Sequence, residues 1–569
     1  MPIHNTSHGN RPTVRPKLLL DFANSKDLDP RVIFSRHSSA TYYDGKSNVK
    51  AEENLFIYSQ EVASWPRGSG STITSNTASA PDGTTTADRI LAAANWYGAY
   101  RVSLQAGQQY TLSVYVKSNT ASNQNFVLFR ENSIYVATET ATTSWQRFTY
   151  TFTVNSSTAS DYGLWNTGNG IGNDLLVWGM QLEQRSLATS YIATTSVPIV
   201  KYQPKLQTAI TNEPRFDHDP VTGESKGLLI EESRTNLDTS SDTINFLYNT
   251  TSNNNYGIAP DGTQSADLGA YQSNGAAIGL FNGNKPTSSG AYTWSVFVKK
   301  FGDINVIRVY DNNASVYADF NIDIGTVVGG NASRRDIIDV GNGWYRVWMS
   351  SNVSINTTYF QIYGYDSIGS VFNTINNYNG IFVWGSQVEQ GSFPTSYIPT
   401  YGQSIARNEE RAYVNVESIL DVHNGTIYAE SISGPIGWDV SGQYNVFHYG
   451  NSNDDGYGVF KESGSGDFWF HLRKNNTSLF NVSNGSQWNS NTLSKVVISF
   501  DPSTQNYFVD GTQVGGDQTT SLYQLDSSDI TELQIGFTGN SGYFNGHIKK
   551  IAAYNTKLPN AALQAMTEE

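Results

Sequence analysis

The sequence predicts an all-β protein: tandem antiparallel β-sandwich (jelly-roll) domains with an extended N-terminal arm. Three observations lead to this fold class, namely the composition, a long internal repeat, and short alternating apolar and polar runs separated by turn dipeptides. Aromatic residues make up 13% of the 569 residues, charged residues only 15%, and Gly occurs 50 times. Because soluble proteins usually carry about 25% charged residues, hydroxyls and amides must cover much of this surface. This composition favours strands and turns over helices.

Composition and charge also exclude several functional classes. The chain has no Cys, which excludes disulfides, thiolate metal sites and cysteine nucleophiles. Its net charge of −14 disfavours binding to the phosphates of nucleic acids. No apolar run approaches the ~20 residues that span a bilayer, and the first residues lack the features of a signal peptide. We therefore expect a soluble protein that is made in a cytoplasm and has no membrane span.

Residues 1–50 form the expected arm and attachment segment, because the first 20 residues hold three prolines and show no periodicity. An internal repeat then divides the chain. The sequence of residues 178–194 recurs at residues 384–400, with 11 of 17 positions identical. Shorter anchors recur in the same order, pairing residues 80–84 with 259–263, 110–117 with 292–299, and 145–147 with 344–346. The repeat predicts two homologous sandwiches at 51–200 and 236–403, joined by a connector at 201–235.

The two sandwiches and the C-terminal third differ in pattern. Residues 110–116 and 147–154 alternate as half-buried strands do, and Asn-Gly and Asp-Gly pairs mark antiparallel turns. A linker at 404–423 leads to a third domain at 424–569, which contains a hairpin turning at Asp510-Gly511 and ends in a short helix over residues 558–566.

Two families are suggested by these residues. The C-terminal module resembles laminin-G-like, concanavalin A-like jelly rolls, through the hairpin at 507–511, the strand at 544–548 and the closing segment 554–558. The rest resembles tailed-phage virion proteins described as head spike, fibre or tail-associated proteins. That resemblance rests on residues 20–23, 34–42, 212–220 and 227–237 and on both Trp-Gly-x-Gln-x-Glu-Gln blocks. In that family the blocks like 34–42 and 212–220 usually lie close together, so about 170 intervening residues indicate an inserted or duplicated module.

The phage resemblance implies carbohydrate-binding-module-like sandwiches in a structural virion protein that is not an enzyme. Such a protein forms a head or tail appendage, a fibre or spike, that binds a host cell-surface glycan. The resemblance further implies attachment to capsid or tail proteins through the arm, and a homo-oligomer for which a trimer is one option. No cofactor is required. Two alternatives remain, a capsid decoration (cement) protein that binds no glycan and a polysaccharide depolymerase.

Clusters of titratable residues give little support to catalysis. The acidic pairs 52–53, 231–232 and 409–410 suggest a glycosidase, but consecutive residues of an extended chain diverge, so we expect solvated boundary turns. Residues 216–220, Phe-Asp-His-Asp-Pro, suggest a metal or acid–base site, for which a structural turn is the favoured alternative. The eight His show no triad or His-x-x-x-His spacing.

The aromatic residues point to sugar binding. Trp145 and Trp344, like Trp178 and Trp384, occupy equivalent places in the two copies, which favours core roles. Aromatic residues without a counterpart are the candidates for stacking on the apolar face of a pyranose: Trp96, Tyr97, Tyr100, Trp165, Trp438, Trp469 and Trp488. A buried or merely exposed loop aromatic is the alternative for each.

A structural calcium ion is a further hypothesis. Residues 451–456 are rich in oxygen donors, and the predicted ligands are Asn451, Asn453, Asp454 and Asp455. The loop lacks the closing Glu of an EF-hand, so a plain Asn/Gly turn is the alternative.

Overall fold

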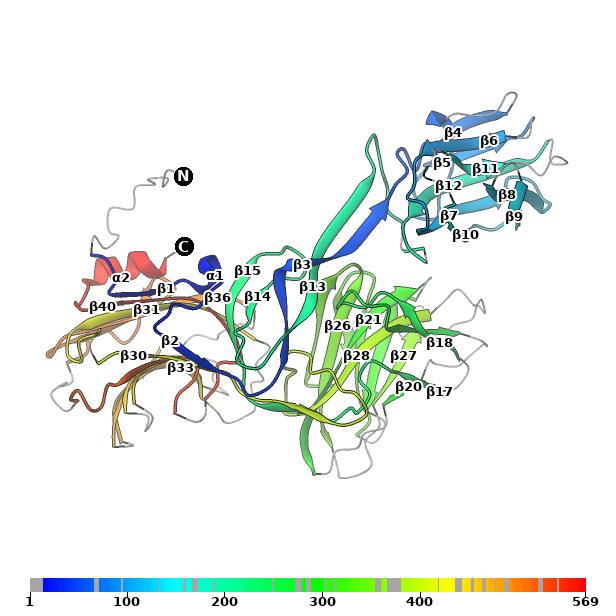
Figure 1. The fold of residues 1–569 in the computed structure, drawn as a ribbon. Helices are drawn as coiled ribbons and strands as arrows, with labels where there is room; N and C mark the ends of the chain where they lie inside the picture. The colour runs from blue at the N-terminus through cyan, green and yellow to red at the C-terminus, as the bar shows by residue number, and fades with distance from the viewer. Residues whose placement is uncertain are drawn as a thin grey trace. The chain divides into compact units, whose positions relative to one another are not determined.

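A computed structural model of the chain describes most of the residues (Figure 1). The described ranges are 14–65, 71–93, 96–131, 134–155, 157, 160–165, 172–186, 188–189, 191–247, 250–271, 279–282, 288–301, 304–311, 314–353, 360–365, 380–417, 419–434, 443–451, 455–462, 467–475, 477–485, 491–519, 525–539 and 542–568. The chain divides into two compact units, Lys50–Tyr202 and the remainder. Every strand pairing whose register is known in the described ranges is antiparallel, and the strands form eight sheets, so the all-β fold class is confirmed. No helix in the described ranges is long and apolar enough to cross a membrane.

The unit Lys50–Tyr202, here called the first sandwich, has a five-stranded sheet of order β10-β7-β12-β5-β4 and a four-stranded sheet of order β6-β11-β8-β9. A single-turn 3-10 helix (Val62–Ser64) precedes the first of its strands. The strands are β4 (Thr72–Ala78), β5 (Ala87–Leu91), β6 (Trp96–Val102), β7 (Gln109–Ser118), β8 (Gln124–Glu131), β9 (Ile134–Ala141), β10 (Gln146–Thr153), β11 (Ser160–Trp165) and β12 (Asp174–Glu183). Alternate residues such as Leu112 and Val114 of β7 meet Phe126 and Leu128 of β8 in the core.

The second sandwich pairs two six-stranded sheets, of order β17-β20-β27-β22-β23-β24 and β18-β19-β28-β21-β26-β25. Its strands are β17 (Asn245–Leu247), β18 (Thr250–Gly257), β19 (Ala266–Tyr271), β20 (Gly279–Asn282), β21 (Gly290–Phe301), β22 (Val306–Asp311), β23 (Val316–Asn321), β24 (Thr326–Gly330), β25 (Arg334–Gly341), β26 (Trp344–Val353), β27 (Phe360–Tyr365) and β28 (Gly380–Gln390). Val296, Val309 and Ile362 lie in its core.

The repeat is visible in individual hydrogen bonds. Trp178 Nε1 donates to Thr86 Oγ1 over 2.9 Å, and Trp384 Nε1 donates to Ser265 Oγ over 3.0 Å in the second copy. The side-chain amide of Asn54 donates to the carbonyls of residues 180 and 192, and Asn236 does the same to residues 386 and 398. The expected core roles are confirmed for Trp178, Trp344 and Trp384, which are at most 4% exposed. Trp145 is partly exposed, and its indole N–H donates to the carbonyl of residue 79.

The C-terminal sandwich pairs an eight-stranded and a seven-stranded sheet, with β31 and β40 central in the first and β32 in the second. Its strands in the C-terminal third are β30 (Arg411–Asn415), β31 (Gly425–Ser433), β32 (Gln443–Gly450), β33 (Gly456–Glu462), β34 (Phe468–Lys474), β35 (Thr477–Ser483), β36 (Leu493–Phe500), β37 (Gln505–Val509), β38 (Thr512–Gln513), β39 (Glu532–Ile535) and β40 (Gly546–Tyr554). The predicted turn at Asp510-Gly511 is confirmed, since both residues have positive φ between β37 and β38. Helix α2 (Asn560–Thr567) packs Leu563 against Tyr428 and Phe508.

Residues expected in the N-terminal arm form part of the C-terminal sandwich. Strand β1 (Leu18–Leu20) pairs with β40, and β2 (Val32–Ser35) pairs with β30. The short helix α1 (Phe22–Ser25) lies between them in the chain. Leu18, Leu20 and Phe22 are almost fully buried in the core, which explains why this stretch is a strand and a helix rather than an extended arm. Residues 1–13 lie outside the described ranges.

The connector also contributes strands. Strand β14 (Phe216–His218) pairs with β15 (Ser225–Ile230), which pairs with β40 in the same eight-stranded sheet. Two short sheets complete the chain, formed by β3 (Ala40–Asn54) with β13 (Ile199–Ala209) and by β16 (Arg234–Asn236) with β29 (Ile405–Arg407). The boundaries between the two compact units fall within β3, after Val49, and within β13, after Tyr202.

Five charged side chains lie buried together in the larger unit, and we call them the Arg–Glu cluster: Arg36, Arg215, Glu231, Arg407 and Glu410. Arg215 lies 2.6 Å from Glu410 and 2.7 Å from Glu231, and Arg36 lies 3.0 Å from Glu410. Arg407 is 3.5 Å from Glu231 and 3.7 Å from Glu410. The cluster therefore joins the N-terminal segment, the connector and the stretch that follows the second sandwich.

The expectation that Glu231 and Glu410 lie in solvated turns is wrong, because they are 6% and 0% exposed. Burial alone would raise the pKa of Glu231, but the charges of Arg407 and Arg215 outweigh burial and hold that pKa far below its ordinary value. Glu53 is likewise buried, and it pairs with Lys50 over 2.7 Å. These carboxylates are bound to arginine, lysine or backbone N–H groups, which removes them as a catalytic pair.

Asp238 provides a pH-dependence prediction for the second sandwich. It is 2% exposed, and burial raises the pKa of its carboxyl to about 6. The folded chain therefore takes up a proton between about pH 6 and pH 4 that the unfolded chain does not, so this group destabilises the fold as pH rises through 6. We expect Asp238→Asn to raise the free energy of unfolding at pH 7 by on the order of 1–3 kcal/mol and to change it little at pH 4. Urea unfolding of both chains at the two pH values measures the difference, and an equal effect at both would contradict it.

Candidate functional site

Three tyrosines and three polar residues gather on one face of the six-stranded sheet that contains β22, β23 and β27. We call this group, which comprises Arg308, Tyr310, Tyr317, Asp319, Gln361 and Tyr363, the tyrosine face. The three strands alternate, so that Ile307, Val309, Ala318, Phe320, Phe360 and Ile362 point into the core. The tyrosine-face residues occupy the intervening positions, and all except Asp319 are partly exposed.

The strand register brings these residues into two adjacent rows. Arg308 is paired with both Asp319 and Tyr363, and Tyr310 is paired with both Tyr317 and Gln361. The rings of Tyr310 and Tyr363 are 6.0 Å apart and nearly perpendicular. Tyr363 donates its hydroxyl hydrogen to Gln361 Oε1. Cross-strand neighbours of this kind hold one another in place, so the face is a fixed platform rather than a set of mobile side chains.

A charged pair fixes the polar part of the face. Arg308 donates through Nε and Nη2 to the two oxygens of Asp319 over 2.6 and 2.9 Å. Its guanidinium also lies 3.9 Å from the ring centre of Tyr317. A bidentate pair restricts the arginine to one plane, and stacking on the tyrosine supports the same plane. The result is a surface of three partly exposed tyrosine rings beside the guanidinium of Arg308 and the side-chain amide of Gln361.

This arrangement suits a ligand that has both an apolar flat face and hydroxyl groups. Aromatic rings supply apolar contact area with little loss of conformational entropy, while the amide and charged groups orient a ligand through hydrogen bonds. Tyr310, Tyr317 and Tyr363 are not among the predicted sugar-stacking residues, which are mainly tryptophans without a counterpart in the other copy. The signal that could have found them is the period-2 pattern Arg308-x-Tyr310, Tyr317-x-Asp319 and Gln361-x-Tyr363, which places each pair on one face.

In the first sandwich, Trp165 of β11 pairs with Val127 of β8. Trp165 itself is 1% exposed and packs on Val127. The structure therefore makes Trp165 a core residue, which corrects its prediction as a sugar-stacking candidate.

Because Trp165 is buried, shortening it should affect stability and not ligand binding. We expect Trp165→Phe to lower the free energy of unfolding of the first sandwich by about 1–2 kcal/mol, through lost contacts and a small cavity. Calorimetry of the whole chain should show one transition shifted, while glycan binding is unchanged. A loss of binding with no change in stability would contradict the core role.

The remaining sugar-stacking candidates are Trp96, Tyr97 and Tyr100 of the first sandwich and Trp438 and Trp488 of the third domain. Tyr100 is partly buried, with its ring 5.9 Å from Phe56 and 5.7 Å from Trp65 at the edge of the core. Trp96 and Tyr97 lie in β6, but their side chains are outside the described part, as are the residues Trp438 and Trp488. Their predicted role in stacking on sugars stays a prediction.

The Phe-Asp-His-Asp-Pro segment, residues 216–220, is not entirely a turn, because its first three residues form strand β14. Asp217 accepts hydrogen bonds from His547 Nε2 and from the backbone N–H of Tyr43, both over 2.8 Å. His218 Nδ1 lies 3.0 Å from the carbonyl oxygen of Tyr43. Burial raises the pKa of Asp217, whereas the hydrogen bond from His547 lowers it. The resulting pKa of Asp217 lies below its ordinary value. Asp217 and His218 thus make separate contacts and do not converge on one point as metal ligands would.

In the C-terminal sandwich, Trp469 lies on the face of β34 that is opposite to the core residues Phe468 and Phe470. It is partly exposed, and its indole N–H has no hydrogen-bond partner in the described ranges. His471 follows on the same face, with its ring 5.1 Å from Phe460. Burial and the neighbouring His448 lower the pKa of His471 well below its ordinary value, so this imidazole is neutral.

Comparison with known proteins bears on this sandwich. Residues 429–564 match the Laminin_G_3 family, described as the Concanavalin A-like lectin/glucanases superfamily. The C-terminal sandwich is a laminin-G-like domain. No curated protein matches the chain. The predicted resemblance of this part is thereby confirmed, and strands β1, β2, β14 and β15 extend the laminin-G-like domain from outside the matched residues.

Solved structures with sandwich domains are also similar. The carbohydrate-binding module CBM40 of the Ruminococcus gnavus IT-sialidase has a TM-score of 0.22 and 14% identity, over 26% of this chain and 83% of that chain. The tandem CBM22-1–CBM22-2 of Paenibacillus barcinonensis Xyn10C has a TM-score of 0.20 and 9% identity, over 61% and 99%. Domains LG4-5 of the mouse laminin α1 chain have a TM-score of 0.17 and 11% identity, over 57% and 88%.

The predicted calcium ligands lie at a hairpin of the laminin-G-like domain, between β32 and β33. The side-chain Oδ1 of Asn451 accepts a hydrogen bond from the backbone N–H of Asp455 over 3.2 Å. The backbone N–H of Asn451 donates to the carbonyl oxygen of Asp455 over 3.0 Å. Asn453 and Asp454 lie outside the described ranges. Within those ranges, no three His, Asp or Glu side chains are grouped as metal ligands. Calcium binding here stays a prediction.

Proposed function

We propose that the protein is a non-enzymatic glycan-binding appendage of a tailed-phage virion, a fibre or spike that adheres to the host surface. The observation that carries glycan binding is the tyrosine face of the second sandwich. Its three rings provide stacking area, and the partly exposed side chains of Arg308 and Gln361 provide polar groups that sugar hydroxyls can bind.

The laminin-G-like domain supports the same proposal. Its family includes lectins by the description given above, and Trp469 presents a partly exposed ring. Two separate sugar-binding surfaces on one chain would raise the avidity for a repetitive polysaccharide without a new contact.

The phage assignment is supported by the sequence blocks that resemble virion appendage proteins. In the structure three of these blocks meet in the Arg–Glu cluster, to which they contribute Arg36, Arg215 and Glu231. We assign these blocks an internal role in holding the larger unit together, and we assign attachment to capsid or tail proteins to the N-terminal segment that precedes β1.

The test measures binding of the full-length protein to an immobilised panel of bacterial surface polysaccharides, followed by an assay for new reducing ends. The expected result is saturable binding without release of reducing ends. Deleting residues 424–569 is unsuitable, because β1 and β15 would lose their partner β40, so point variants replace the deletion. Absence of binding to every polysaccharide would favour the cement alternative, and released reducing ends would establish a depolymerase.

A further inference from the structure

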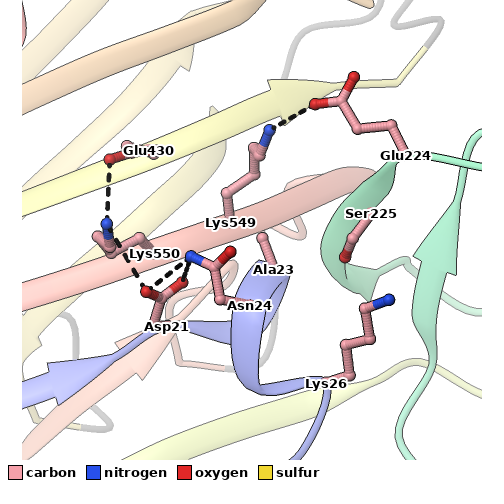
Figure 2. A pocket seen from close by; sticks show the side chains of 9 residues that line it. All are labelled: Asp21, Ala23, Asn24, Lys26, Glu224, Ser225, Glu430, Lys549 and Lys550. Atoms are coloured by element: carbon pink, nitrogen blue, oxygen red, sulfur yellow. Dashed lines mark hydrogen bonds and ion pairs between the residues drawn. The ribbon is translucent and has the colours of Figure 1, made fainter. Parts of the chain in front are cut away.

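A polar pocket of about 390 Å³ lies on the laminin-G-like domain, away from its core. Its walls come from α1, from the start of β15, from Glu430 of β31 and from Lys549 and Lys550 of β40 (Figure 2). All of these elements belong to the larger unit. A pocket of this size is in the range of small-molecule sites and can hold one or two sugar rings.

The charges that line the pocket are balanced. Its three lysines are Lys26, Lys549 and Lys550, and its three carboxylates are Asp21, Glu224 and Glu430. Figure 2 shows them alternating around the opening, with Lys550 between two of the carboxylates. Because the formal charges cancel, the pocket offers little net attraction to either an anion or a cation.

The ion pairs in the pocket are long. Lys550 Nζ lies 3.7 Å from Asp21 and 3.7 Å from Glu430, and Lys549 Nζ lies 3.4 Å from Glu224. Charge-assisted hydrogen bonds between such groups are normally about 2.7–2.9 Å long. The ammonium groups are therefore held in place by the carboxylates without strong hydrogen bonds to them, and each has three N–H donors.

We propose that this pocket is a second ligand site, for a neutral, hydroxyl-rich molecule such as an uncharged sugar unit. A sugar hydroxyl donates and accepts at once, so neighbouring hydroxyls can donate to a carboxylate and accept from an ammonium group. The alternation of Lys550 with Asp21 and Glu430 matches that requirement. Phosphate or a uronic acid would gain no net attraction from its charge, because the three ammonium groups and the three carboxylates cancel. The site is separate from the tyrosine face and does not depend on it.

The test uses saturation-transfer NMR on the full chain carrying Tyr310→Ala and Tyr363→Ala, so that the tyrosine face does not contribute. The probes are the methyl glycosides of glucose, galactose, mannose and N-acetylglucosamine, with inorganic phosphate and methyl glucuronide as charged comparisons. We expect at least one neutral glycoside to bind with a Kd of about 1 mM, and the charged probes to bind more weakly.

Two variants test whether the glycoside binds in this pocket. Ala23→Tyr fills the pocket from α1 without removing an ion pair, and Lys550→Met removes the shared ammonium group. Each should weaken binding about tenfold or more, with the melting temperature recorded to confirm folding. Binding that is unchanged in Ala23→Tyr, binding of phosphate in preference to the glycosides, or no binding of any neutral glycoside would each overturn the proposal. These readouts do not depend on whether the tyrosine face binds polysaccharide.

Discussion

Replacing Glu410 by Gln is expected to lower the free energy of unfolding of the larger unit by about 3–5 kcal/mol, the cost of breaking a buried ion pair from one side. Glu410 is fully buried and accepts hydrogen bonds from Arg36, from Arg215 and from the backbone N–H of residue 231. Without its charge, three buried arginines would face Glu231 alone. Urea unfolding of the full chain, with fluorescence detection, measures the change.

Asp323→Asn is the matched control for this variant. Asp323 pairs with Lys300 over 2.7 Å in the same unit, but its side chain is 52% exposed. Exposed pairs contribute about 0–1 kcal/mol, so the same acid-to-amide change should have little effect here. The transition of the first sandwich, which is a separate compact unit, should stay in place in both variants. Equal small effects of the two substitutions would show that the Arg–Glu cluster is not a source of stability.

Replacing Tyr310 and Tyr363 by Ala is expected to weaken polysaccharide binding by about 10- to 100-fold, at roughly 0.5–1.5 kcal/mol for each aromatic contact. Both rings are partly exposed on the tyrosine face, and neither belongs to the core of the second sandwich. Stability should therefore change much less than affinity does. Surface plasmon resonance against the polysaccharide that binds best, with thermal unfolding of each variant, separates the two effects.

Tyr401→Ala is the control for the tyrosine-face variants, because Tyr401 is 73% exposed in the stretch after the second sandwich and is not part of the tyrosine face. Full affinity is expected for it. If the double variant keeps its affinity while Trp469→Ala loses it, glycan binding belongs to the laminin-G-like domain. If neither variant loses affinity, the tyrosine face has no part in adhesion.

The repeat shows how far sequence reasoning reaches in this chain. Two copies of one pattern predicted two sandwiches, and the structure shows the same indole hydrogen bonds at Trp178 and Trp384. Core positions could be predicted because a buried tryptophan tolerates few changes, so both copies keep it. Trp165 could not be classified in this way, because it has no counterpart and its burial depends on packing against Val127 of another strand.

The acidic pairs show where sequence reasoning failed. We predicted that Glu231 and Glu410 are solvated, because their arginine partners are distant in the sequence. Arg36, for example, is separated from Glu410 by 374 positions. No local sequence pattern indicates such a partner. The strands of the N-terminal segment were missed for a related reason, since β1 and β2 are too short to show periodicity and gain their stability from β40 and β30.

Local sequence features were enough to predict the all-β class, the duplicated sandwich and the laminin-G-like third domain, because alternation, turn dipeptides and repeated anchors are local properties of a chain. Which aromatic residues are exposed and which charges are buried depends on tertiary contacts. Tyr310, Tyr317 and Tyr363 become one surface through strand register, and five distant charges become one cluster through packing. Exposure and proximity depend on contacts between residues far apart in the sequence, and folding alone brings those residues together.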